Sequence, residues 1–162
     1  MKAKRTLVLH IFLIMVLRII LTQTACNPYK IKLSQSNNDS IEKYLYNKVI
    51  KPSFGGKVFS SYKVLGTEEN KIYVWAYLQE YFKQEGKITK GTGWSVPLIL
   101  NVDWQQDQIN IINYEAPRDG DYYAEDIRKY FPKAIQKIII NFPESKDIKE
   151  LEATSQSRSK AL

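Results

Sequence analysis

Residues Lys71–Gln84 have the sequence KIYVWAYLQEYFKQ, the longest β-like segment of the chain. In an extended strand, alternate side chains point to opposite faces of a sheet. One face of this segment is aliphatic (Ile72, Val74, Ala76 and Leu78), and the other carries large aromatic rings (Tyr73, Trp75, Tyr77 and Tyr81). The segment therefore predicts a sheet of which helices cover one face or both.

Three more segments have β-like sequences: Lys57–Leu65, Trp94–Trp104 and Gln108–Glu115. Polar turns of a few residues separate the four segments, which favours an antiparallel meander over parallel crossovers. Pro97 lies inside the third segment. Because proline donates no ladder hydrogen bond, it indicates an edge strand or a bulge.

Helical patterns flank the strands. Asp39 and Glu42 have the spacing of a capping box and predict a first helix over about Ser40–Lys51. After the strands, Asp121 is expected to cap a helix from about Tyr122 to Tyr130.

Pro132 follows that helix and either starts a new helix, over about Ala134–Ile140, or kinks the existing one. The order of elements predicts an α+β fold, a four-stranded antiparallel sheet with an N-terminal and a C-terminal helix in a cystatin-like layout.

The chain begins with the features of an export signal. The positive stretch Lys2–Arg5 precedes the apolar run Leu7–Leu21, and a polar exit leads to Cys26. An uncleaved anchor is the alternative, although the run is shorter than the roughly 20 apolar residues of a membrane span. We expect a signal peptide over 1–25, a tether over 26–38, a single domain over 39–142 and a charged, largely disordered tail over 143–162.

Cys26, the only cysteine, lies where bacterial lipoprotein signals place their modified cysteine. Ala25 before it fits that pattern, whereas Gln23 departs from it because lipoproteins have a Leu-like residue there. Lipidation of Cys26 is therefore one hypothesis, and an ordinary signal peptide is the other. The first predicts a lipid-anchored protein on the extracytoplasmic face of the cell membrane, and the second a secreted protein.

Charge and histidine content narrow the possible functions. The leader holds four of the 24 basic residues and none of the 17 acidic ones, which leaves a net charge of +3 beyond it. Nucleic-acid binding needs a concentrated basic face, so we expect no nucleic-acid partner. The only histidine, His10, lies in the leader. The rest of the chain therefore lacks the residues of a Ser-His-Asp system or a His/Cys zinc site, and we expect no cofactor and no metal.

Two routes to an enzyme remain. A pair of carboxylates in a cleft, as in glycoside hydrolysis, would come from Glu80, Asp103, Glu115, Asp119 or Asp121. A serine–lysine pair would use Ser60 or Ser61 with Lys63. Carboxylates at strand ends and alternating Ser and Lys on a strand are more often simply solvated.

The aromatic residues suggest a binding surface. An exposed row of rings on a sheet suits contacts with a sugar or a peptide, whereas a covered row would be core. Both interpretations stay open. The candidate ligand-binding residues are Trp75, Tyr77, Trp94, Arg118, Tyr122 and Tyr123.

The run Tyr114–Tyr123, with its Pro-Arg-Asp-Gly-x-Tyr-Tyr stretch, resembles an uncharacterised extracytoplasmic domain of low-GC Gram-positive bacteria. In that family the domain stands alone or follows membrane sensor peptidases of the BlaR type. The resemblance covers about Lys57–Pro132 and implies location and fold, but no mechanism.

Together these features predict a binding or sensing domain of the cell envelope without catalytic activity. Its expected partners are the membrane, through a lipid or signal anchor, and an envelope protein, a peptide or a glycan. The alternative is a small carboxylate-dependent hydrolase that acts on envelope material.

Overall fold

A computed structural model of the chain describes residues 33–162. The predicted signal peptide, the lipidation of Cys26 and the first part of the tether lie outside the described residues. Within 33–162, none of the helices combines the length and the apolar character that a membrane crossing requires.

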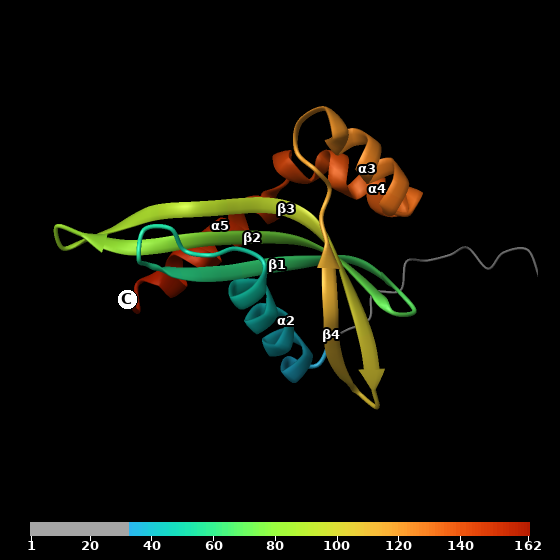
Figure 1. Cartoon of the computed structure of the whole chain (residues 1–162), viewed down its shortest axis with the longest axis horizontal. Helices are drawn as coiled ribbons and strands as arrows, with labels where there is room; N and C mark the ends of the chain where they lie inside the picture. Colours follow the sequence, from blue (N-terminus) through green and yellow to red (C-terminus); the bar gives the residue numbers. More distant parts are fainter. Residues whose placement is uncertain (1–32) are drawn as a thin grey trace, which may run out of the picture.

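The centre of the described region is one antiparallel sheet in the order β1-β2-β3-β4 (Figure 1). Its strands are β1 (Lys57–Glu68), β2 (Lys71–Gln84), β3 (Lys87–Gln105) and β4 (Gln108–Glu115). Each strand pairs with the next one along the chain, which confirms the predicted meander. With an N-terminal helix and C-terminal helices, the fold is α+β as expected.

Pro97 lies in the part of β3 that pairs with only one other strand. It pairs with Trp75 of β2, whereas the pairing of β3 with β4 begins only at Ile99, opposite Glu115. Although β3 is an inner strand of the sheet, it is therefore an edge at Pro97, and the missing N–H breaks no bond to β4.

The N-terminal helix α2 spans Gln35–Lys48 and starts earlier than predicted. Ser34 is its N-cap and accepts a hydrogen bond from the backbone N–H of Asn37. The prediction of a capping box at Asp39 and Glu42 is therefore wrong. The end of the predicted tether 26–38 is also helical, because α2 begins at Gln35. The helix buries Ile41 and Leu45 against the sheet, as its apolar spacing predicts.

Beyond the sheet follow η1 (Gly120–Tyr122), α3 (Tyr123–Tyr130), α4 (Lys133–Asn141), η2 (Phe142–Glu144) and α5 (Lys146–Ser159). Pro132 is the N-cap of α4, so it starts a new helix rather than kinking the previous one. Its fixed backbone suits the first positions of a helix, where no N–H is needed.

The tail from residue 143 is ordered, which corrects the prediction of disorder. Helix α5 buries Leu151, Ser155 and Ser159 and lies along β1 and β2. The buried Ser61 hydroxyl donates to the Leu151 carbonyl oxygen at 2.7 Å, and the Arg158 guanidinium donates to the Ser60 carbonyl oxygen at 2.6 Å. These bonds fix α5 to β1 although the helix carries few apolar side chains.

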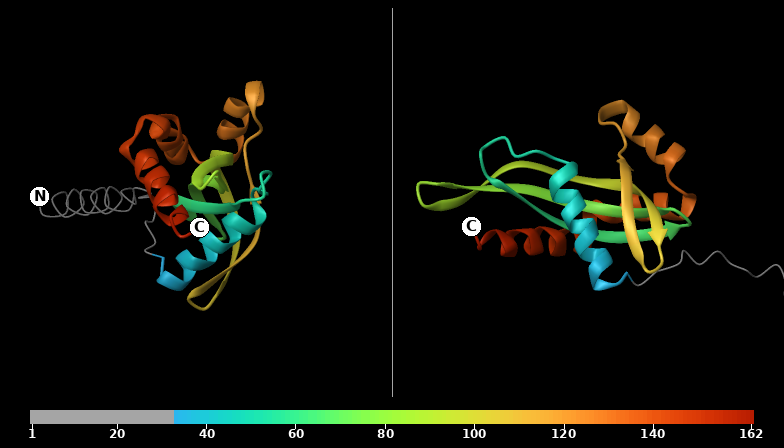
Figure 2. Two further views of the ribbon diagram at one scale, coloured as in Figure 1. Left: turned by 90° about the vertical axis from the view of Figure 1, so that its left-hand side faces the viewer. Right: turned by 60° about the horizontal axis from the view of Figure 1, so that its bottom comes forward.

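Helices cover both faces of the sheet (Figure 2). The aliphatic face of β2 packs with α2 residues such as Ile41 and Leu45. The aromatic face packs with residues of the C-terminal helices: Ile127, Phe131, Ile135, Ile139, Phe142 and Leu151. The alternation of Lys71–Gln84 thus separates two apolar clusters of the described residues.

Candidate functional site

Trp75, the centre of the predicted aromatic surface, belongs to the core. Its side chain is 4% exposed, and its ring stacks on that of Phe142, with centroids 4.6 Å apart and planes 12° from parallel. The indole N–H donates to the Ser95 hydroxyl at 3.0 Å. The prediction of Trp75 as a ligand-binding residue is therefore wrong, because the C-terminal helices cover its face of the sheet.

Tyr77 and Trp94 do not form one surface. Tyr77 is half-buried against the aromatic cluster, whereas Trp94 pairs with Leu78 and packs against the cluster that contains α2. They lie on opposite faces of the sheet, because directly paired residues share a face. A ligand could not contact both rings from one side.

Arg118 stabilises the turn that precedes α3. Its Nε and Nη2 donate to the two carboxylate oxygens of Asp126 at 2.8 and 2.7 Å, and its backbone N–H donates to Oδ2 at 2.9 Å. The Arg118 guanidinium carbon also lies 4.3 Å from the centroid of the Tyr122 ring. Asp126 is buried, and these bonds from Arg118 lower its pKa to about 2. The guanidinium of Arg118, expected from the sequence to bind a ligand, is therefore bonded to Asp126 of α3.

The paired tyrosines of this turn have different environments. Tyr122 is exposed beneath Arg118, whereas Tyr123 packs against the aromatic cluster.

The backbone of this turn begins with glycine. Gly120 has φ +68°, which other residues rarely adopt. Asp121 lies inside η1 and is not the N-cap that the sequence predicted; Asp119 precedes η1, and Tyr122 precedes α3.

The five carboxylates considered for catalysis do not meet in a cleft. Asp103, Glu115, Asp119 and Asp121 are exposed. Glu80 is buried, and its two oxygens accept four backbone N–H bonds, from Ser53, Phe54, Gly56 and Thr92, at 2.8–3.2 Å. Burial alone would raise the pKa of Glu80, but the four N–H donors outweigh it and lower the pKa to about 2.

Glu80 therefore holds a loop rather than a substrate. Its carboxylate fixes residues 53–56, the segment between α2 and β1, against the β2–β3 hairpin. The fit is close, because a Cβ on Gly56 would lie 2.3 Å from the Tyr81 carbonyl oxygen. Gly56 and Gly91 were the available signal in the sequence, because the Gly56 N–H donates to this carboxylate and a Cβ on Gly91 would lie 2.8 Å from Glu80 Oε2.

The serine–lysine pair is also engaged elsewhere. The hydroxyls of Ser60 and Ser61 donate to backbone carbonyl oxygens of α2 and α5, and Lys63 pairs with Asp147 at 3.2 Å. Within residues 33–162, no three His, Cys, Asp or Glu side chains gather as they would around a metal ion.

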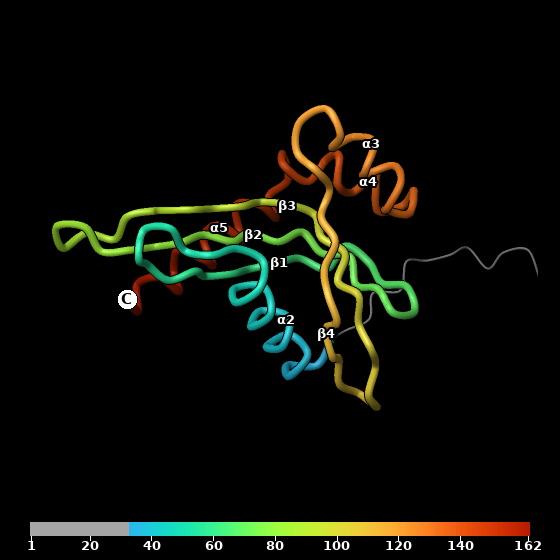
Figure 3. The backbone as a smooth tube through the Cα atoms, viewed as in Figure 1, coloured from blue at the N-terminus to red at the C-terminus, as the bar shows by residue number. Residues whose placement is uncertain are grey.

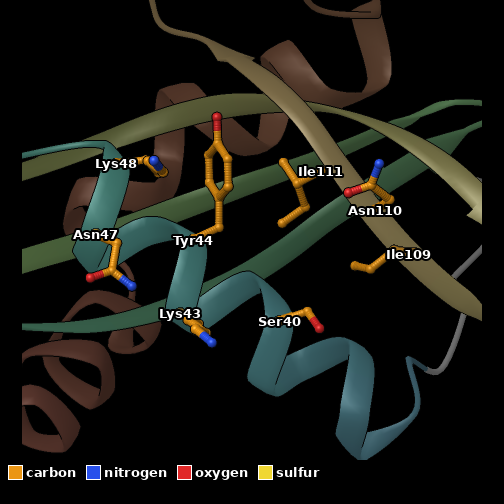
Figure 4. Close-up of a pocket in the computed structure, with 8 residues that line it drawn as sticks. All are labelled: Ser40, Lys43, Tyr44, Asn47, Lys48, Ile109, Asn110 and Ile111. Carbon is orange, nitrogen blue, oxygen red and sulfur yellow. The ribbon is translucent and has the colours of Figure 1, made fainter.

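A groove between α2 and β4 is the candidate binding site. Its volume is about 290 Å³, near the lower limit of ligand pockets, which span roughly 300–1,000 Å³. The residues that line it are Ser40, Lys43, Tyr44, Asn47 and Lys48 of α2 and Ile109, Asn110 and Ile111 of β4. In Figure 4, the Tyr44 ring and Ile111 lie between the helix and the strand, with polar side chains around them. An apolar floor with polar groups around it is typical of ligand sites.

Tyr44 supplies both ring and hydroxyl to this groove. Its ring packs edge-on against Tyr114, with centroids 6.4 Å apart. Burial, together with the neighbouring Tyr114, raises the pKa of Tyr44, so its hydroxyl stays protonated and can donate a hydrogen bond.

The groove also borders the free edge of β4. The Ile109 N–H donates to the Asn37 side-chain oxygen at 3.1 Å, and the Asn37 amide donates to the Asp107 carbonyl oxygen at 2.9 Å. The N–H of Ile109 thus points away from β3. Because antiparallel ladders alternate, the N–H and C=O of Ile111 point to the same free edge.

No pattern in the sequence predicted this groove. Its lysines, Ser40 and Asn47 are ordinary exposed helix residues, Asn110 is an exposed strand residue, and its isoleucines resemble core residues. They come together only because the curved sheet brings α2 against β4 as well as β1.

The chain matches no model of a protein family, no curated protein and no solved structure. The resemblance of Tyr114–Tyr123 to an extracytoplasmic domain therefore stays a prediction.

Proposed function

We propose that the protein is a non-catalytic binding domain held at the outer face of the cell membrane, and that its α2–β4 groove captures a short extended peptide bearing a carboxylate. The observation that carries this proposal is the groove itself, with an apolar floor, two lysines and a free strand edge. The location rests on the leader sequence.

The strand edge favours a peptide. An extended segment that lies beside an edge strand gains main-chain hydrogen bonds, while pockets receive its alternate side chains. Asn37 already bonds to the edge in this way, since its amide accepts from Ile109 and donates to Asp107. The next outward N–H and C=O belong to Ile111, which lines the groove, and a peptide backbone would bond there.

The charges favour an acidic side chain on that peptide. Lys43 and Lys48 line the groove, and none of the lining residues is acidic. Both lysines are exposed, so each contributes modest energy but discriminates against a basic ligand. Ser40, Asn47 and Asn110 add polar groups that can orient the segment.

We propose no catalysis because the two buried carboxylates, Glu80 and Asp126, already accept hydrogen bonds from other groups of the fold. Glu80 is saturated by backbone N–H groups, and Asp126 by Arg118. Neither carboxylate retains the access or the raised pKa that a general acid in hydrolysis needs.

Fluorescence anisotropy with labelled peptides tests the proposal. The probe is a peptide of alternating valine and glutamate, and the comparison peptide has lysine in place of glutamate. We expect the glutamate peptide to bind the full chain at least tenfold more tightly, and K43S/K48S to remove that preference. The matched control K129S/K137S changes exposed lysines of α3 and α4.

Equal binding of the two peptides, or an unchanged preference in K43S/K48S, contradicts an acidic peptide ligand. Binding of neither peptide, with capture of a glycan instead, would replace a peptide by a sugar as the ligand.

A further inference from the structure

The β2–β3 hairpin carries exposed apolar side chains at the end of the molecule. Figure 3 shows this hairpin projecting beyond the helices that cover the rest of the sheet. Phe54 is 61% exposed and stacks on Phe82, with ring centroids 5.4 Å apart. Ile88, 41% exposed, pairs with Lys83 next to the turn. We call Phe54 together with Phe82–Lys90 the hairpin tip.

The structure holds Phe54 in this exposed position. The backbone N–H of Phe54 and those of Ser53 and Gly56 donate to the buried Glu80 carboxylate. A Cβ on Gly91 would lie 2.9 Å from the Phe54 ring, so the ring lies directly on the β3 backbone. A buried carboxylate with four donors is a costly way to fix a surface loop, and the loop it fixes presents an aromatic ring to solvent.

The turn itself is built to project. Glu85 and Gly86 both have positive φ, +51° and +74°, which is the type I′ geometry of a tight two-residue hairpin. On the other side, the C-terminal segment contacts the hairpin, since Lys90 pairs with Glu152 of α5 and Lys83 donates to the carbonyl oxygen of Leu162, which lies beyond the end of α5. The tip thus has contacts on both sides and projects from the sheet, unlike a groove that would receive a peptide.

Lysines surround these apolar side chains. Lys51, Lys57 and Lys87 are exposed and form no ion pair with any residue of 33–162. Glu85 is the only acidic residue within 51–57 and 82–90. Aromatic and aliphatic groups with adjacent lysines are the features that bind the headgroup region of anionic membranes.

We propose that the hairpin tip docks end-on on an anionic phospholipid surface, with Phe54 and Phe82 on one face of the hairpin and Ile88 on the other entering the headgroup region. Lys51, Lys57 and Lys87 then lie against the lipid phosphates. This contact is separate from the leader and from the α2–β4 groove. It places a second point of the domain at the membrane, beyond the predicted anchor at Cys26.

Spin labels on the full chain test this contact. The label is placed by I88C in a C26S background, and the chain is reconstituted in vesicles of phosphatidylglycerol or of phosphatidylcholine. The readout is the ratio of label accessibility to oxygen and to a water-soluble nickel complex, which rises with membrane depth. The leader is present with both lipids, so only the local depth is compared.

We expect the ratio at position 88 to rise in phosphatidylglycerol vesicles and to stay at its aqueous value in phosphatidylcholine. A label introduced by Q84C, at an exposed position next to the turn, should behave in the same way. The control label, by I140C on α4, replaces a side chain that is 73% exposed and should stay aqueous in both lipids.

The lysines are tested by K51Q/K87Q. Each lysine near an anionic surface favours binding about fivefold, so we expect the docked fraction to fall by roughly 25-fold relative to the free fraction. K129Q/K137Q, the matched control on α3 and α4, should leave it unchanged. An aqueous value at both positions 84 and 88 in phosphatidylglycerol overturns the proposal, as does an equal rise in phosphatidylcholine; the first result would point to an acidic protein as the partner of the tip.

Discussion

Replacing Phe142 by alanine tests whether the aromatic face of β2 is core. Phe142 is 2% exposed, and its ring covers that of Trp75 at a centroid distance of 4.6 Å. Truncating a buried phenylalanine costs about 3–5 kcal/mol, the sum of lost transfer energy and a residual cavity. Because Phe142 lies in the short segment η2, which can relax into part of the cavity, we expect about 3–4 kcal/mol for F142A.

Urea unfolding of the full chain, followed by tryptophan fluorescence and circular dichroism, measures this cost. With a slope of about 2 kcal/mol per molar urea, the midpoint should fall by roughly 1.5–2 M. The control I140A removes an exposed side chain of α4 and should change stability by less than about 0.5 kcal/mol. If F142A is as mild as I140A, the rings of β2 are not covered as described, and a binding role for Trp75 must be reconsidered.

Three further predictions concern the buried carboxylates, the close-packed loop and the tail. The pKa values of Glu80 and Asp126 are both about 2 in the folded chain, below their usual 4.5 and 3.8. Depressed values stabilise the fold above about pH 4.5, and this stability is lost as the pH falls toward 2. Thermal unfolding between pH 6 and pH 2 should therefore show a steep loss of stability that E80Q reduces, and a flat profile would contradict the assigned hydrogen bonds. G56A should destabilise the chain by about 2 kcal/mol, because its Cβ would clash with the β2 backbone; an unchanged urea midpoint would show that the loop does not lie as close as described. L151A should cost about 2–3 kcal/mol, and cooperative unfolding at the wild-type midpoint would mean that the tail is not part of the fold.

The alternation of residues in Lys71–Gln84 was enough to predict the sheet. It separated the two faces correctly, and the polar turns set the strand order. What alternation could not decide is which face is covered. That depends on the C-terminal helices, whose packing against Trp75 is a long-range contact with no local signal.

The tail, residues 143–162, was predicted to be disordered because burial was judged only from its number of apolar residues. Ile148 and Leu151 are its only aliphatic side chains before Leu162 apart from small alanines. The helix is instead held through small buried serines, since Ser155 and Ser159 let α5 approach β1 closely, and through the Arg158 hydrogen bonds. Hydrophobic periodicity does not register such contacts.

The candidate site is formed by residues that are distant in the chain, so it was harder to predict than the fold. Arg118 was expected to bind a ligand, but its guanidinium bonds to Asp126, which lies eight residues further on, inside α3. Likewise, Lys43 and Ile111 are far apart in the chain and become neighbours only through the curvature of the sheet. Residue types alone gave no reason to pair them.

Nuclear magnetic resonance of the isotope-labelled full chain, titrated with the valine–glutamate peptide, tests most directly where the ligand binds. We predict shifts of the amide signals of Lys43, Lys48 and Ile111, while the indole N–H signal of Trp75 stays in place because its ring is covered. A shift of the Trp75 indole without change at Ile111 would contradict a site in the α2–β4 groove and return the aromatic face to consideration.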